Sequence, residues 1–289
     1  MGFQHSGNAY WIQIEFNGMN TELIFIIVFA CFGSFLNVVI HRYYSKESVI
    51  FGSSHCPKCK YKIKWFDNIP IVSWLFLQGR CRACKKPISF IYPIVEILCA
   101  FIGYSLFFSA DHFFISGYKH DWSLSIALLS FFVFCGFLVI TFIDLKSKII
   151  PHRFLIFSGL NVFFIHFLTG NKSDSFMDGL IGMFTLAVSL AGVLWIGSLM
   201  LKRDAMGWGD VKMALVIGFL LGLNFGYVAI FTAIFTGAVF GLLMMASKKM
   251  KNQNYRNLEM PFGPFLALGT YLTFLYGPKL INDFFSILS

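Results

Sequence analysis

The stretch GWGDVKMALVIGFLLGLNFGYVAIFTAIFTGAVFGLLMMASK, residues 207–248, is almost entirely apolar. After Asp210 and Lys212 it carries no further charged side chain until Lys248. A run of this length fits either one very long helix or two shorter helices joined by a tight turn. Basic residues at both ends favour the hairpin, because both ends then lie on the cytoplasmic side of a membrane. We therefore expect helices at 211–225 and 227–247.

The composition of the whole chain agrees with this interpretation. Hydrophobic residues make up 57% of the 289 residues and charged residues only 13%, and the mean hydropathy is +0.71. Soluble domains are about 45–50% apolar. The sequence therefore predicts an all-α integral membrane protein of about eight transmembrane helices, the other six lying at 22–40, 92–109, 124–143, 154–169, 179–201 and 263–283.

The basic residues predict the orientation of these helices. When eight spans alternate, all but three of the 23 Lys and Arg residues fall on one face, the exceptions being Lys119, Lys172 and Lys279. The positive-inside rule makes that face cytoplasmic and places both termini outside. The net charge of +9 thus follows from topology in a lipid bilayer and requires no nucleic acid. Residues 1–21 lack a signal-peptide pattern, so we expect the first span to direct insertion.

The largest segment outside the predicted spans, residues 41–91, contains CPKCKYKIKWFDNIPIVSWLFLQGRCRAC. Its two Cys-x-x-Cys pairs are separated by 21 residues, close to the spacing of four-thiolate zinc sites. About 50 residues bury too little apolar surface to fold alone, and a metal supplies the missing stability. Reduced thiols or two disulfides are the alternatives, and a reducing cytoplasm disfavours disulfides. The predicted structural Zn²⁺ ligands are Cys56, Cys59, Cys81 and Cys84.

The remaining cysteines lie in apolar runs. We expect Cys31, Cys99 and Cys135 to be small core residues rather than ligands. His55 directly precedes the first cysteine pair, but four thiolates already complete a tetrahedral site. A histidine ligand is therefore not expected.

Two aspartates lie at the ends of predicted spans, where a carboxylate is costly and suggests function. Asp144 follows the third span in TFIDLKSKIIPHR, and Asp210 begins the sixth in GWGDVK. In the predicted topology both reach the cytoplasmic face from different helices. Two nearby carboxyl groups do not ionise together easily, so one can activate water while the other protonates a carbonyl oxygen. The alternative is that each aspartate caps a helix or is a solvated helix end.

Several motifs resemble the bacterial type 4 prepilin peptidases. They are GSFLNVVIHR at 33–42, FDNIPIVSWLFLQGRCRACKKPISFIYPIVE at 66–96, IDLKSKIIP at 143–151, GWGDVK at 207–212 and PFGPFLALG at 261–269. The resemblance implies that Asp144 and Asp210 are the catalytic aspartates and that the four loop cysteines match the family's cytoplasmic tetrad. One departure is that His152 and Arg153 follow Pro151, where family members often have an acidic residue, which can alter leader preference.

The resemblance also implies an activity and a location. Family members cut the short basic leader from prepilins and pseudopilins at the cytoplasmic face of the bacterial inner membrane. Many then methylate the new N-terminal amine with S-adenosylmethionine. The expected organisation is an outer segment with the first helix (1–40), a zinc-binding loop domain (41–91) and a seven-helix membrane peptidase domain (92–289).

Methylation has weaker support in the sequence itself, because the chain has no G-x-G-x-x-G element and the loop is too small for an α/β nucleotide-binding domain. An S-adenosylmethionine site would have to form between the loop and the helix ends. Asp67, Asn68 and Glu96 could serve there. Turn formation explains Asp67 and Asn68 equally well, and Glu96 and Asn37 are better explained as buried hydrogen-bonding partners. A peptidase without methyltransferase activity stays an alternative.

Two other classes use similar features. A proton-coupled transporter also places carboxylates in a membrane, although the two halves of this chain lack an internal repeat. A membrane assembly factor could use the zinc loop only for docking. Replacing both aspartates would separate these classes from a hydrolase.

Overall fold

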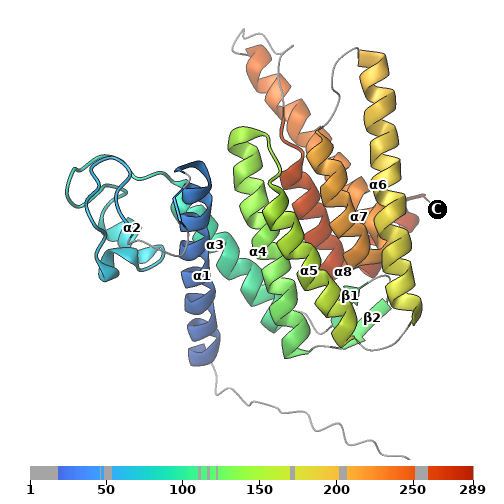
Figure 1. The fold of residues 1–289 in the computed structure, drawn as a ribbon, viewed down its shortest axis with the longest axis horizontal. Helices are drawn as coiled ribbons and strands as arrows, with labels where there is room; N and C mark the ends of the chain where they lie inside the picture. Colours follow the sequence, from blue (N-terminus) through green and yellow to red (C-terminus); the bar gives the residue numbers. More distant parts are fainter. Residues whose placement is uncertain are drawn as a thin grey trace, which may run out of the picture.

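The computed structural model describes residues 19–45, 47–48, 54–109, 112–115, 118–121, 123–169, 173–201, 207–250 and 260–288. Within these residues the chain is nearly all helical (Figure 1). The elements, in chain order, are α1 (Met19–Ser45), the 3-10 helix η1 (Trp65–Asn68), α2 (Val72–Phe76), α3 (Ile91–Tyr104), the π-helical turn η2 (Ser105–Ser109), β1 (His112–Ile115), β2 (Tyr118–Asp121), α4 (Leu124–Ser147), α5 (His152–Leu168), α6 (Ser173–Leu201), α7 (Trp208–Met250) and α8 (Gly263–Leu288).

The helices have the length and surface of membrane helices. In the described part of the chain, five are long and apolar enough to cross a membrane: Thr21–Ser45, Ile91–Phe108, Leu124–Ser147, Ser175–Leu199 and Trp208–Ser247. Their outward side chains are large and apolar, as at Val188 and Leu242, which are 69% and 64% exposed. A water-soluble protein rarely exposes contiguous apolar surface on this scale. The protein is therefore a membrane protein.

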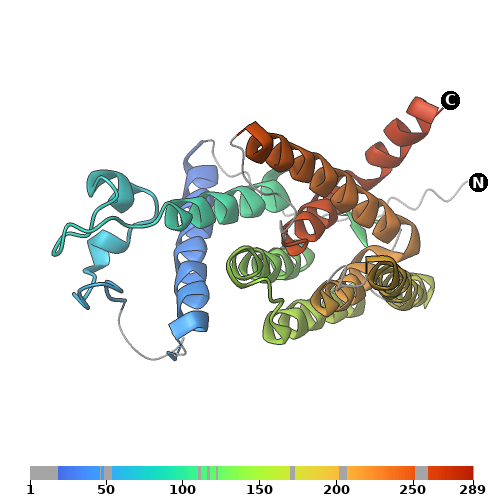
Figure 2. The same cartoon turned by 90° about the horizontal axis from the view of Figure 1, so that it is seen from above.

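The molecule has three parts along its long axis. The cysteine-containing loop lies at one end, α1 and α3 lie next to it, and α4 to α8 form a bundle at the other end (Figure 1). Seen from above, α1 and α3 cross each other, and the loop lies on the side of them away from the bundle (Figure 2). Gly33 permits this crossing, because a Cβ atom there would lie 2.7 Å from the Cα atom of Glu96.

The long helix α7 reverses direction at Gly222. Its φ of 73° and ψ of −171° are non-helical and belong to a backbone region that only glycine adopts readily. The turn packs against Gly182 of α6, where a Cβ atom would lie 2.5 Å from the carbonyl carbon of Gly222. The hydroxyl of Tyr227 then reaches Ser189 Oγ at 3.4 Å, so the chain runs back along α6 after the turn.

Contacts with α8 establish where the second half of α7 ends. A Cβ atom on Gly269 would lie 2.3 Å from the carbonyl oxygen of Ala229, and one on Gly241 would lie 3.4 Å from Met260. Because α8 begins beside Asp144, the end of α7 lies on the same side of the bundle as its start. The two halves form the hairpin that the basic residues at both ends of the stretch predict, but the turn lies at Gly222 rather than at the predicted residue 226, because Gly222 has the backbone conformation that only glycine adopts readily.

The reversal leaves backbone groups that need partners inside the bundle, because no water or lipid there can satisfy them. His166 of α5 donates a hydrogen bond from Nε2 to the carbonyl oxygen of Phe219 at 2.8 Å. On the other side of the turn, the backbone N–H of Leu223 donates to the carboxylate of Asp178. Neither His166 nor Asp178 belongs to a recognisable sequence motif. Their pairing with backbone groups about 50 residues away exists only in the folded chain.

The structure differs from two sequence-based expectations, and a third concerns residues that it does not describe. The β1–β2 hairpin, in which His112 pairs with Asp121, is the departure from an all-α fold. Cys99 and Cys135 are buried as expected, but Cys31 is exposed, because it lies two residues, about 200° of helix rotation, from the Gly33 face of α1. The expected absence of a signal peptide concerns mainly residues 1–18, which lie outside the described residues.

We expect His166→Phe to lower the free energy of unfolding by about 1–3 kcal/mol, because the Phe219 carbonyl then loses its donor inside the bundle. The measurement is the unfolding transition of purified protein in detergent micelles. The same substitution at the exposed His152 of α5 is the control and should have little effect. Equal transitions for the two variants would contradict this account of the turn.

Candidate functional site

Three helix ends meet on one side of the bundle and bring the predicted aspartates together. Asp144 lies near the C-terminal end of α4, and Asp210 lies in the first turn of α7. Their residues are only 4% and 6% exposed, and the negative charge of Asp144 acts on Asp210. The third end is the start of α8 at Gly263. The two carboxyl groups thus come from separate helices, and both are buried near enough for the charge of one to act on the other.

Backbone N–H groups at helix N-termini orient both carboxyl groups. The N–H of Gly263 donates to Asp144 Oδ2 at 3.0 Å, and the N–H of Gly207 donates to the carboxylate of Asp210. Helix N-termini carry partial positive charge and stabilise anions. No basic side chain within the described ranges forms an ion pair with either aspartate. The capping interpretation therefore accounts for one hydrogen bond of Asp210 but leaves the burial of two acids at one place unexplained.

Three glycines lie near the aspartate pair, and they differ in how much space a side chain would have there. A Cβ atom on Gly263 would lie 2.7 Å from Asp144 Oδ2, so any side chain there would displace the carboxylate. Sequence reasoning missed this role, although Gly263 lies in the PFGPFLALG motif. Gly209 packs against Ile150, where a Cβ atom would lie 2.8 Å from the Ile150 Cβ. Gly207 is exposed, and a Cβ atom there would make only an ordinary contact with Asp210 Oδ2, at 3.5 Å. Of the two glycines in GWGD, Gly207 is therefore the exposed one, and Gly209 is half-buried.

The four loop cysteines form a compact cluster. Their Sγ atoms all lie within 4.8 Å of one another, and the Cys56–Cys84 and Cys59–Cys81 sulfur pairs are each 4.0 Å apart. A tetrahedral zinc with Zn–S bonds of about 2.3 Å places its sulfurs about 3.8 Å apart. The cluster therefore fits a tetrahedral metal ion. All seven cysteines of the chain are free thiols rather than disulfides.

The two Cys-x-x-Cys turns share one backbone pattern. In each, the first cysteine accepts a hydrogen bond from the residue after the second cysteine, and that residue, Lys60 or Lys85, has a left-handed φ of 59° or 55°. Burial raises the pKa of the Cys56 thiol, but backbone N–H groups of Cys59 and Lys58 outweigh this and lower the pKa to about 7. A thiolate is the form that binds metal. Each Cys-x-x-Cys turn thus presents two of the four cysteines with the same backbone conformation.

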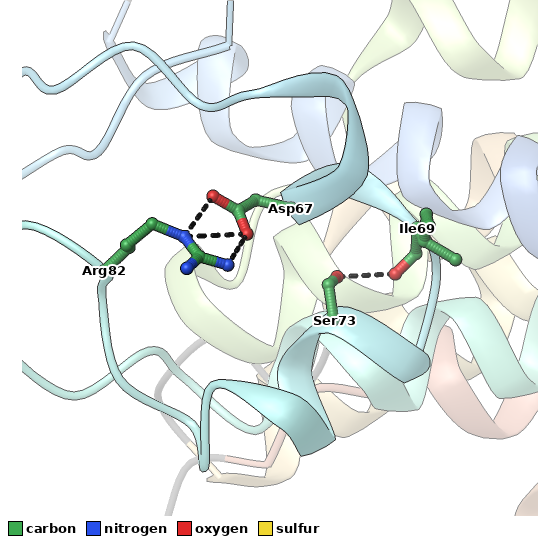
Figure 3. A network of polar contacts seen from close by, with 4 residues as sticks. All are labelled: Asp67, Ile69, Ser73 and Arg82. Carbon is green, nitrogen blue, oxygen red and sulfur yellow. Dashed lines mark hydrogen bonds and ion pairs between the residues drawn. The ribbon is translucent and has the colours of Figure 1, made fainter.

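A charged pair ties the turn at FDNIP to the second cysteine turn (Figure 3). Arg82 Nε donates to both carboxylate oxygens of Asp67 at 3.1 and 2.8 Å, and Nη2 donates to Oδ1 at 2.6 Å. These hydrogen bonds hold the pKa of Asp67 below its ordinary value. Ser73 Oγ donates to the Ile69 carbonyl oxygen at 2.5 Å and closes the next turn. Asp67 thus acts as a cross-link within the loop.

Glu96 joins the loop to the crossing helices. It is 7% exposed, and its Oε2 accepts the backbone N–H of Ile71 at 2.7 Å. Ser34 and Asn37 of α1 also hydrogen bond to its carboxylate, and Asn37 Nδ2 donates to the Tyr92 carbonyl oxygen at 3.0 Å. Ile71 has a φ of 61°, which is unfavourable for a β-branched residue. The interpretation of Glu96 and Asn37 as buried hydrogen-bonding partners is confirmed.

Comparison with known proteins assigns the chain to a family. The family model of the bacterial peptidase A24 N-terminal domain matches residues 27–110, and that of the type IV leader peptidase family matches residues 131–242. A prepilin leader peptidase/N-methyltransferase of Dichelobacter nodosus is 31% identical over 287 residues, covering 86% of this chain and 89% of the relative. One from Bacillus subtilis (strain 168) is 31% identical over 241 residues, with coverages of 81% and 86%. No solved structure matches the chain.

The helices and these matches define a membrane-bound peptidase. The chain belongs to the type IV leader peptidase family. The first match contains the four loop cysteines and the second contains both aspartates. This assignment favours the enzyme over the transporter and the assembly factor.

Metal removal should open the loop without unfolding the bundle, because the metal substitutes for a core that the loop lacks. We expect chelation, or Cys81→Ser, to accelerate hydrogen exchange several-fold across residues 55–88 and to leave α4 to α8 protected. Cys31→Ser is the control, because Cys31 is exposed on α1 and outside the cluster. Unchanged exchange in the loop after verified metal loss would contradict a structural metal.

Proposed function

We propose that this protein removes the short basic leader peptide from type 4 prepilins and pseudopilins, using Asp144 and Asp210 as an aspartic peptidase pair. The observation that carries the proposal is the burial of two carboxyl groups at one end of the bundle, without a basic partner among the described residues. Relatives across most of the chain are named prepilin leader peptidase/N-methyltransferase. Burying two acids together without a cation is costly, and general acid and base catalysis of hydrolysis is a function that uses such a pair.

The geometry supports general acid and base catalysis. Two neighbouring carboxyl groups that are buried without a cation would share one proton, so that one is ionised and the other is not. The ionised group takes a proton from water as the water oxygen attacks the scissile carbonyl carbon. The protonated group donates to the carbonyl oxygen. The C–N bond then breaks as the nitrogen receives a proton, and the pair returns to its starting state.

The proposed setting is the bacterial inner membrane, crossed by about eight helices with both termini in the periplasm and the aspartates at the cytoplasmic face. In this arrangement residues 41–91 are a cytoplasmic loop domain and residues 92–289 form the peptidase domain. A prepilin's apolar segment would pack against the helices while its leader reaches the aspartates. The lipid-facing apolar surface supports the membrane setting, and the basic loops support the orientation.

Two further groups belong to the proposal. Zn²⁺ in the cysteine cluster has a structural role, because four protein thiolates leave no coordination position for catalysis. The relatives are named N-methyltransferases, and the family resemblance implies S-adenosylmethionine as the methyl donor. When bound, it would supply an activated methyl group for the neutral N-terminal amine and would leave as the thioether.

Asp144→Asn and Asp210→Asn should each lower leader cleavage at least 10²-fold, because each removes one partner of the proton-sharing pair. Cleavage of a purified prepilin in detergent, followed by intact mass, is the measurement. Glu22→Gln, in the first turn of α1, is the matched control and should cleave normally. If both asparagine variants cleave at the normal rate, the peptidase assignment to this pair fails.

Gly263→Ala should reduce cleavage about 10²-fold while Asp144 and Asp210 are both intact. The added methyl group displaces the Asp144 carboxylate, and a shift of about 1 Å in a catalytic group costs that much. Gly192→Ala is the control, because a Cβ atom there meets nothing within 4 Å. Normal cleavage by Gly263→Ala, in protein that folds normally, would exclude Gly263 from the site.

A further inference from the structure

A cavity of about 520 Å³ lies between the cysteine loop and the crossing helices. Its walls come from α1, α3 and the loop, and they include Asn37, Glu96 and Trp74. Pockets for small molecules and cofactors in proteins are commonly about 300–1,000 Å³. The aspartate pair takes no part in this cavity, since neither Asp144 nor Asp210 lines it. Peptide hydrolysis at the aspartates therefore does not account for this cavity.

The cavity walls are amphipathic. Three aromatic side chains, Tyr61, Trp74 and Tyr92, face it together with acidic Glu47 and basic Lys86. The indole Nε1–H of Trp74 is buried and has no hydrogen-bond partner among the described residues. A buried donor without a partner costs free energy, which a bound ligand with an acceptor atom would recover.

We propose that this cavity binds S-adenosylmethionine, an inference that rests on the methyl transfer included in the proposed function. The ligand combines a flat adenine ring, ribose hydroxyl groups, a cationic sulfonium, and an amino acid end with both charges. Aromatic walls suit the adenine ring, carboxylates suit cations and ribose hydroxyls, and lysine suits the carboxylate. Trp74 would donate its free indole N–H to a ligand acceptor. The residues present therefore fit the donor without a G-x-G-x-x-G element.

The cavity is made by the same contacts that hold the loop in place. Glu96 draws the Ile71 N–H toward α3, and the strained backbone of Ile71 persists because this hydrogen bond holds it. Asp67 and Arg82, which also line the cavity, fix the second cysteine turn. The cysteine cluster and the Glu96 contact thus hold the walls of the cavity in place.

The cavity is connected to the peptidase end of the bundle through α1. His41 and Arg42 line the cavity, and one turn of helix away Tyr44 donates from its hydroxyl to the Ile143 carbonyl oxygen at 3.0 Å. Ile143 directly precedes Asp144. A new N-terminal amine formed at the aspartates therefore lies on the same side of the molecule as the cavity.

The test is calorimetric binding of S-adenosylmethionine to full-length, zinc-loaded protein in detergent. Trp74→Phe removes the indole donor and should weaken binding about three- to tenfold. Val38→Phe fills the cavity from the α1 wall and should weaken it at least tenfold. Trp65→Phe is the matched control, because Trp65 lies in the same loop, is 82% exposed and does not line the cavity. Zinc content and leader cleavage should be unchanged in all three variants.

The outcomes separate this inference from the proposed function. Normal binding by both Trp74→Phe and Val38→Phe overturns the cavity assignment, even if the wild-type protein cleaves and methylates. If the wild-type protein cleaves but neither binds S-adenosylmethionine nor adds one methyl group by intact mass, the proposed methyl transfer fails, and the cavity assignment fails with it. Asp144→Asn should bind S-adenosylmethionine normally, because the aspartates belong to the other site.

Discussion

The bundle is organised around two buried carboxyl groups that are oriented by backbone N–H groups rather than by cations. Gly263 at the start of α8 donates to Asp144, and Gly207 before α7 donates to Asp210. A lysine or arginine in this place would hold both groups ionised and remove the proton that we propose they share. Helix N-termini stabilise negative charge without supplying a full positive charge. The two carboxyl groups can therefore be buried together in a state that suits the proposed acid and base roles.

This constraint explains the unusual path of α7. Asp210 must begin a helix on the side where α4 ends, and the chain must return to that side to begin α8 at Gly263. A straight helix of 43 residues would end far from its start. The reversal at Gly222 solves this problem, and His166 and Asp178 satisfy the backbone groups that the reversal exposes. The turn at Gly222 therefore allows both the start of α7 and the start of α8 to lie on the side of the bundle where α4 ends.

The loop domain is held together by local attachments, whereas the helix bundle is held together by packing. It has little core of its own, and its shape comes from three local attachments: the four-cysteine cluster, the Asp67–Arg82 pair and the hydrogen bond between Glu96 and Ile71. The first two fold the loop on itself, and the third holds it against α1 and α3. The space enclosed by these attachments is the proposed methyl-donor cavity. In the proposed function, this separate attachment would give one chain two reactions at two distinct sites.

Much of this was determined by the sequence alone. Apolar runs of helix length, the basic loops, the two Cys-x-x-Cys pairs and two aspartates at span ends predict the membrane helices, the metal cluster and the acidic pair, because hydropathy, charge and ligand spacing are local properties. Only the tertiary structure decided the partners of Gly263, His166 and Glu96, the exposure of Cys31, the short β1–β2 hairpin and the enclosed cavity. Most of these depend on which helix faces meet, and residues far apart in the chain carry no sequence signal of their contact.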